Sequence, residues 1–140
     1  MARGGVYLLL ILASLTLSVP AFGGQQPEDS KLFMAGLNLY QKRDYASSAA
    51  KLNELITQYP DSPLRDLTLF WLSRSYYRSG NQQEAARCFS QLVKEYPDTT
   101  LKGLVEDEFR GVVARYERGE KLPTKAGAVD KQVASLPQDQ

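Results

Sequence analysis

Residues 32–60 read LFMAGLNLYQKRDYASSAAKLNELITQYP, and residues 69–97 read LFWLSRSYYRSGNQQEAARCFSQLVKEYP. The two stretches align without a gap at an offset of 37 residues. The positions that are identical in both are Leu32/Leu69, Phe33/Phe70, Tyr40/Tyr77, Ala49/Ala86, Leu55/Leu92, Tyr59/Tyr96 and Pro60/Pro97. A period of this length, built from helical patterns, is typical of helical repeat arrays, whose stacked surfaces usually bind other proteins. The repeat therefore predicts an all-α fold and a binding function.

Apolar residues at helical spacing predict two helices in each unit, at about 30–41, 45–58, 63–79 and 82–95. Short polar side chains favour the helix starts, namely Asp29 or Ser30, Asp44, Ser62 before Pro63, and Asn81 in a capping box with Glu84. The Tyr-Pro pairs and Gly80 favour the ends of these helices. A fifth helix is predicted over about 100–118, ending at Gly119.

Residues 1–24 have the pattern of a secretory signal peptide. Arg3 supplies a positive start, an apolar run covers 6–17, and Ala21 and Gly23 are small residues placed as a cleavage site requires. We expect cleavage after Gly23, or as a second choice after Ala21, and the alternative is an uncleaved membrane anchor. The apolar run is shorter than the roughly 20 residues of a spanning helix, which favours cleavage. No cysteine follows it, so we expect an exported chain without a lipid anchor, located in the periplasm of a bacterium with two membranes.

Polar segments flank the predicted helical domain, which spans 30–119. Residues 25–29 contain Pro27 and are predicted to be a flexible lead. Residues 120–140 contain Pro123 and Pro137 without an obvious amphipathic pattern, and they are predicted to be a disordered tail.

The pattern of small and large residues in each unit resembles the tetratricopeptide repeat. The residues that carry the resemblance in the first unit are Leu32, Ala35, Gly36, Leu39, Tyr45, Ser48, Leu52, Leu55 and Pro60. Those in the second unit are Leu69, Leu72, Ser73, Tyr76, Gln82, Ala85, Phe89, Leu92 and Pro97. The resemblance implies a right-handed α-solenoid of two helical hairpins, at about 29–62 and 66–99, with a C-terminal capping helix at about 100–118.

A narrower resemblance rests on the loop Tyr-Pro-Asp-Ser-Pro-Leu at 59–64 and the phrase Leu-Phe-Trp-Leu-Ser-Arg-Ser-Tyr-Tyr at 69–77. Both are similar to repeats of periplasmic Tol-Pal system proteins and of the outer-membrane assembly lipoproteins. The chain departs from both groups, because it has no coiled-coil segment between Gly24 and Ser30 and no lipidated cysteine. The resemblance implies a partner in the bacterial cell envelope.

In stacked helical hairpins the first helix of each pair lines the inner surface. The residues predicted to face this groove and bind a partner are Phe33, Leu37, Tyr40, Phe70, Arg74, Tyr77 and Arg78. Asp107 and Arg115 of the fifth helix are predicted to face the groove as well. The repeat-equivalent aromatics would form two short rows, and arginine binds carboxylates with paired hydrogen bonds. In the alternative interpretation the aromatics only pack repeat against repeat, the arginines form a solvated face, and Trp71 is an inter-helix contact.

Composition argues against several other functions. The 140 residues include no histidine and carry a formal net charge of +1, so neither a metal site, a cofactor nor nucleic acid binding is expected. The acidic run 106–108 points in different directions around a helix, so its carboxylates do not converge on a substrate and no enzyme is expected. Cys88 is the single cysteine, so it is a small buried hydrophobic residue, the source of a disulfide to another chain, or a reactive thiol.

These observations together predict an exported adaptor or scaffold that binds a partner protein or peptide through its concave helical face. The alternative is a structural repeat protein that self-associates and has no groove ligand.

Overall fold

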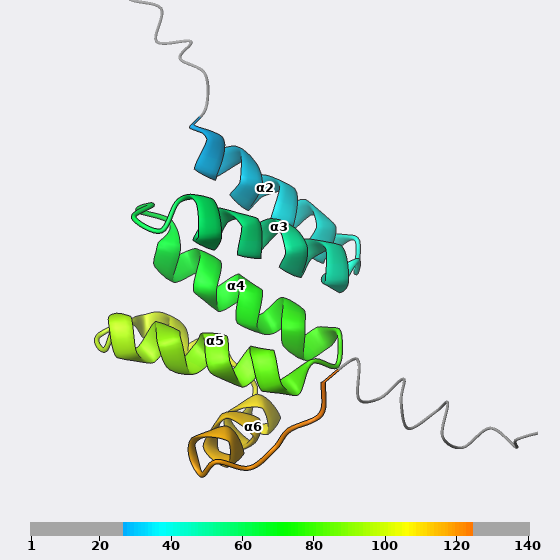
Figure 1. The fold of residues 1–140 in the computed structure, drawn as a ribbon, viewed down its shortest axis with the longest axis vertical. Coiled ribbons are helices and arrows are strands. Elements are labelled where there is room, and N and C mark those ends of the chain that lie inside the picture. The colour runs from blue at the N-terminus through cyan, green and yellow to red at the C-terminus, as the bar shows by residue number, and fades with distance from the viewer. Residues whose placement is uncertain (1–26, 125–140) are drawn as a thin grey trace, which may run out of the picture.

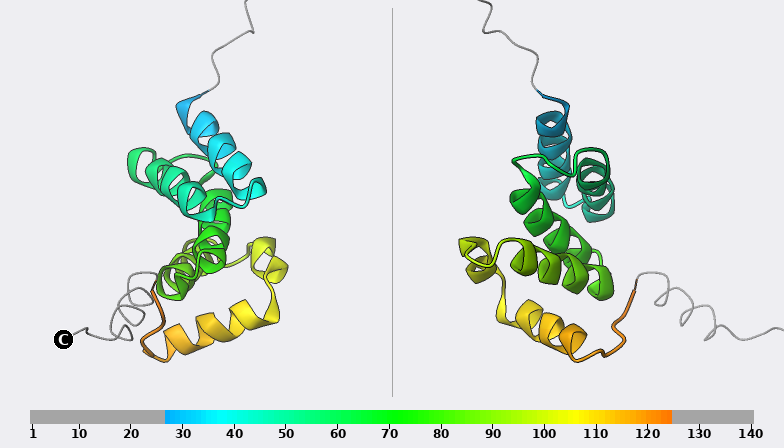
Figure 2. Two further views of the ribbon diagram at one scale, coloured as in Figure 1. Left: turned by 90° about the vertical axis from the view of Figure 1, so that its right-hand side faces the viewer. Right: turned by 60° about the vertical axis from the view of Figure 1, so that its left-hand side comes forward.

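The computed structural model describes residues 27–124, and all of its regular elements are helical. The helices are α2 (Glu28–Gln41), α3 (Tyr45–Gln58), α4 (Arg65–Arg78), α5 (Gln82–Glu95), the 3-10 helix η1 (Thr100–Leu104) and α6 (Asp107–Glu117). They stack in chain order, with α2 and α6 at opposite ends (Figures 1 and 2). The all-α prediction is confirmed: the fold is a solenoid of two hairpins, α2–α3 and α4–α5, followed by a C-terminal helix.

The predicted signal peptide, residues 25–26 of the lead and residues 125–140 of the tail lie outside the described residues. Within residues 27–124, no helix is both long and apolar enough to cross a membrane.

The two hairpins use the same turn at equivalent positions. Arg43 and Gly80, 37 residues apart, both have a positive φ, of 62° and 86°. Asp44 then caps α3 by accepting from the amide of Ser47, and Asn81 caps α5 by accepting from the amide of Glu84. Both predicted caps are confirmed. The reciprocal half of the capping box is absent, because the amide of Asn81 donates to the Tyr76 carbonyl and the Glu84 carboxylate binds Arg87.

The first hairpin packs around small residues. The Ser48 hydroxyl in α3 donates to the carbonyl of Gly36 in α2 at 2.7 Å and lies 3.0 Å from the Ser75 hydroxyl of α4. These buried contacts join three helices, α2, α3 and α4. A cluster of buried apolar side chains continues from this crossing, and its members are Ala49, Leu52, Leu72 and Cys88.

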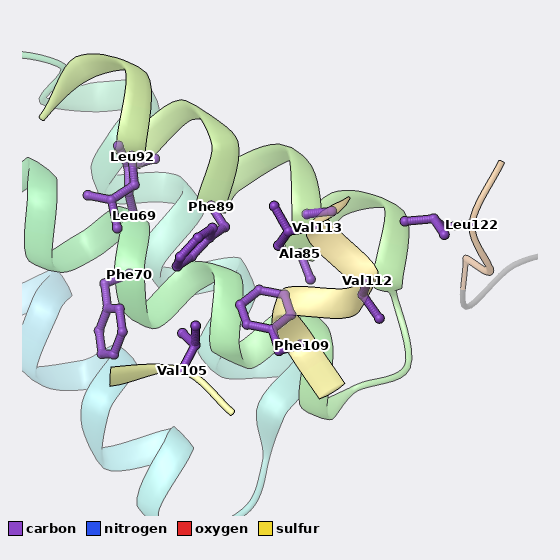
Figure 3. Close-up of a cluster of buried hydrophobic side chains, with 11 residues drawn as sticks. Leu69, Phe70, Ala85, Phe89, Leu92, Val105, Phe109, Val112, Val113 and Leu122 are labelled. Carbon is purple, nitrogen blue, oxygen red and sulfur yellow. The ribbon is translucent and has the colours of Figure 1, made fainter. Parts of the chain in front are cut away.

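A second buried cluster joins α4 and α5 to the C-terminal segment (Figure 3). Phe109 of α6 is fully buried, with its ring centroid 4.8 Å from that of Tyr77 and 5.3 Å from that of Phe89. Val105, Val112 and Val113 join it from the same side. The C-terminal segment therefore closes the apolar end of the second hairpin, as expected for a capping helix.

The predicted continuous fifth helix over 100–118 is wrong. Val105 and Glu106 are extended, with ψ values of 151° and 152°, and they separate η1 from α6. Val105 is buried under the second hairpin, and the break in the helix accompanies that burial. The predicted end at Gly119 is confirmed, because this glycine has a φ of 80° just after α6.

Two further predictions of helix starts are corrected. Helix α2 begins at Glu28, so residues 28 and 29 of the predicted lead are helical, and its N-cap is Pro27 without a side-chain cap. Helix α4 begins at Arg65, two residues later than Ser62 and Pro63 imply. The Ser62 hydroxyl instead accepts from the amide of Leu64 and donates to Asp29, which ties the inter-repeat loop to the start of α2.

The predicted disordered tail is wrong for residues 120–124. Leu122 is only 6% exposed and belongs to the second cluster. Its backbone amide donates to the side-chain oxygen Oε1 of Gln83 at 3.2 Å. The backbone amide of Gln83 in turn donates to the Pro123 carbonyl at 3.3 Å. The chain after α6 therefore folds back onto the start of α5 (Figure 1).

Candidate functional site

A chain of aromatic rings crosses from the first hairpin to the second. The Tyr40 ring of α2 lies edge-on to Tyr45 of α3 at 5.0 Å and to Trp71 of α4 at 5.1 Å, measured between ring centroids. Trp71 in turn lies 5.4 Å from Phe70. Edge-to-face pairs of this kind add about 0.5–1.5 kcal/mol beyond the area they bury. Trp71 is therefore an inter-helix contact, and it remains partly exposed beside Tyr40.

Two arginines of α4 lie next to these rings. The guanidinium carbon of Arg74 lies 5.7 Å from the ring centroids of both Phe70 and Trp71. Nη2 of Arg74 donates to Oε1 of Glu106 at 3.0 Å, and Nη2 of Arg78 lies 3.7 Å from the same oxygen. Two guanidinium groups thus face one carboxylate, which leaves an excess of one positive charge at this place.

Arg78 is the more accessible of the two arginines. Its side chain is 49% exposed, whereas that of Arg74 is 20% exposed. A hydrogen-bonding interaction with the Tyr40 hydroxyl raises the pKa of the Arg78 guanidinium above its ordinary value. Arg78 therefore stays charged and is positioned against an aromatic side chain of the preceding repeat.

The predicted aromatic rows do not form two equivalent exposed pairs. Phe33 is partly buried against the first cluster, whereas its equivalent Phe70 is 3% exposed and belongs to the second cluster. Tyr40 packs on Trp71, whereas its equivalent Tyr77 packs on Phe109. The prediction that Phe70 contacts a partner is therefore corrected. Phe70 packs in the same buried cluster as Val105 and Phe109 of the C-terminal segment.

Of the predicted residues only Phe70 is buried, and the others retain some exposed surface. Phe33 packs on the first cluster and Tyr77 on Phe109. The remaining four, Leu37, Tyr40, Arg74 and Arg78, define the α2–α4 face together with Trp71. Asp107 and Arg115 do not join it: Asp107 faces Arg110 at 3.5 Å, and Arg115 donates to Glu120 at 2.8 Å. The acidic residue near the arginines is Glu106, which the sequence prediction did not assign to the groove.

Sequence reasoning also gave no role to Met34, which is 49% exposed on α2. Its repeat equivalent is Trp71, at an offset of 37 residues, so the register of the repeat could have identified it. Glu106 had no comparable signal, since it lies 32 residues from Arg74 in a segment outside the repeat.

The α2–α4 face carries groups suited to binding. Aromatic rings offer apolar contact area with a polar edge, and arginine offers a charged donor array. Within residues 27–124, no group of three or more cysteine, aspartate and glutamate side chains is placed to hold a metal ion.

Comparison with known families gives a match that covers both helical units. The tetratricopeptide repeat family matches residues 32–62 and 67–99. None of the curated proteins matches the chain. The matched residues contain most of α2, α3, α4 and α5, and the hairpins formed by these helices stack as the repeat requires. Residues 32–99 therefore contain two tetratricopeptide repeats, which form a protein-interaction architecture.

Proposed function

We propose that the protein is an exported, non-catalytic adaptor of the bacterial cell envelope that binds a partner protein or an extended peptide on its α2–α4 face. The observation that carries the proposal is that Tyr40 contacts both Trp71 and Arg78 on this face. Tryptophan, tyrosine and arginine are the residue types that dominate binding energy in protein interfaces. The tetratricopeptide repeats support the interaction role in general.

Site-directed photo-crosslinking tests the binding face. We expect a photoreactive residue at Leu37 or Arg78 to crosslink one discrete partner in cells. The same residue at Ala50, which is exposed on α3, is the matched control and is expected to give no such product. In the chain with the photoreactive residue at position 78, the additional substitution Tyr40→Ala should reduce the yield of the crosslinked product. The helical circular dichroism signal should be retained. Equal yields from Ala50 and Arg78 would rule out the face.

The export part of the proposal is supported by the signal-peptide pattern of residues 1–24 and is tested separately. We expect the protein in the periplasmic fraction, with a mass that corresponds to loss of residues 1–23 or 1–21. A full-length species that sediments with membranes would instead indicate a retained anchor.

Self-association is the second candidate, and the exposure of Met34 favours it. This large apolar side chain lies on α2, the first helix at one end of the described stack. If repeat ends stack on one another, light scattering should give a mass that rises with concentration, and Met34→Lys should abolish the rise. A constant monomer mass would leave partner binding as the function.

A further inference from the structure

A groove lies between α5 and α6, bordered by residues 119–124. It consists of two adjoining cavities, of about 760 Å³ and about 290 Å³. Ser90, Lys94 and Tyr116 line both cavities, so they mark the place where the two meet. Ser90 and Lys94 are four residues apart on α5 and share one helical face, whereas Tyr116 faces them from α6. We call this feature the α5–α6 groove.

The hydroxyl of Ser90 has no hydrogen-bond partner within residues 27–124, although the residue is only 7% exposed. Native proteins contain few such groups, and each is costly unless something satisfies it. The repeat does not require a buried residue here, because the equivalent position 37 residues earlier is the exposed Asn53. Ser90 therefore carries an unused buried donor, and the residue lines both cavities where they meet.

The ionisable side chains of the groove carry a positive excess. Glu120 is bound by Arg115 and Arg118, and these bonds lower the pKa of its carboxyl. Arg87 pairs with Glu84, and Glu95 pairs with Arg65. Among the described residues, no ion pair engages Lys94, Lys121 or Glu117, which leaves two ammonium groups against one carboxylate.

We propose that the α5–α6 groove binds a peptide segment of a partner protein in which an acidic side chain is flanked by apolar ones. The carboxylate accepts a hydrogen bond from Oγ of Ser90 and lies beside the ammonium group of Lys94. The ring of Tyr116 and the side chain of Leu122 offer apolar surface to the flanking residues. This surface is separate from the α2–α4 face, so the inference goes beyond the proposed function.

The length of the groove suits an extended segment. From Gln83 to Glu95, α5 rises by about 18 Å at about 1.5 Å per residue. An extended chain advances about 3.3 Å per residue, so about five residues fit along this length. A pentapeptide with a central glutamate is therefore a suitable probe.

NMR titration of the mature chain with the blocked pentapeptide Ala-Leu-Glu-Leu-Ala tests the proposal. We expect shifts of the backbone amides of Ser90 and Lys94, with the indole signal of Trp71 unchanged. The matched peptide Ala-Leu-Gln-Leu-Ala should bind about tenfold more weakly, because a hydrogen bond to a charged group is worth more than one to a neutral group.

Two variants and one control locate the site. Ser90→Ala and Lys94→Gln should each weaken binding of the glutamate peptide several-fold, and Ser90→Ala should not lower the melting temperature, since it removes an unsatisfied hydroxyl. Lys42→Gln, at an exposed lysine directly after α2, is the control and should bind like the wild type.

Three results would overturn the inference. They are no shift at millimolar peptide, equal binding of the glutamine peptide, and shifts at Trp71 alone, which would assign the peptide to the α2–α4 face and favour the proposed function instead. A chain that ends at Thr124 provides a further test. If the amide signals of Ser90 and Lys94 shift on this truncation without peptide, the groove is occupied by residues 125–140 and not by a partner.

Discussion

Gly36 of α2 lies so close to Leu52 of α3 that a Cβ at position 36 would stand 2.6 Å from Cγ of Leu52. The Gly36 carbonyl also accepts the hydroxyl of Ser48 from the same neighbouring helix. The two helices of the first hairpin therefore cross so closely that there is no space for a side chain at position 36.

Replacing Gly36 by alanine should destabilise the protein. Leu52 is fully buried, so it must shift within a packed core, and we expect a loss of roughly 1–3 kcal/mol in the free energy of unfolding. Gly111→Ala is the control, because its Cβ would meet nothing within 4 Å in α6, and it should add about 0.5–1 kcal/mol through helix propensity. Urea unfolding measures both, and an unchanged midpoint for Gly36→Ala would contradict the close crossing.

Truncating Leu122 should show that residues 120–124 contribute to the fold. Leu122→Ala removes a buried side chain from the second cluster, and we expect a loss of about 2–3 kcal/mol. For a domain of this size, that corresponds to a fall of roughly 10 °C or more in melting temperature. Leu104→Ala changes a leucine that is 61% exposed and should leave the melting temperature nearly unchanged. Equal effects of the two variants would mean that Leu122 is not packed in solution.

The Arg65–Glu95 pair should contribute a pH-dependent part of the stability. Nε and Nη2 of Arg65 donate to the two carboxylate oxygens of Glu95 at 2.7 Å and 3.0 Å, and these bonds lower the pKa of Glu95. A carboxyl whose pKa is lower in the folded state adds stability above its unfolded pKa, and this stability disappears as pH falls through the folded pKa.

Comparison of the wild type with Glu95→Gln measures this contribution. We expect the wild type to be more stable at pH 7 by about 0.5 kcal/mol, a small value because solvent screens the partly exposed pair. The difference should shrink below about pH 4.3, the usual pKa of glutamate. Glu54→Gln, which breaks the exposed contact with Lys51, is the control and should show little difference at either pH. A difference that grows in acid would contradict the assignment.

Cys88 should be unreactive in the folded protein. It is buried, and burial raises the pKa of its thiol to about 11. At pH 8 only about one thiol in a thousand is then ionised, and the thiolate is the reactive form. We expect a thiol reagent to label the native chain slowly and the urea-unfolded chain at once. Rapid labelling of the native chain, or a disulfide-linked dimer on non-reducing gels, would show that this thiol is accessible.

Much of the fold is local and could be predicted from the sequence. Asp44 and Asn81 cap their helices as expected, because a cap depends on atoms within three residues. The break at Val105 and Glu106 could not be predicted in this way, since residues 100–118 keep a helical pattern. It accompanies the burial of Val105 under the second hairpin, which is a long-range contact.

The candidate site was predicted less completely than the fold. Helical spacing placed Tyr40, Arg74 and Arg78 on one face, and the structure brings them together around Trp71 and Glu106. The same spacing treated Phe70 as equivalent to Phe33. The equivalence fails because the C-terminal segment, which lies beyond the matched repeats, buries Phe70, whereas Phe33 is only partly buried against the first cluster.

The sequence by itself determined the two repeats, their helices and their turns, because periodicity and capping act between near neighbours. Only the tertiary structure decided that Glu106 neutralises part of the charge of Arg74 and Arg78, and that Leu122 returns to α5. These contacts join residues 28 to 39 positions apart, and their geometry depends on how a segment without repeat symmetry packs on the array.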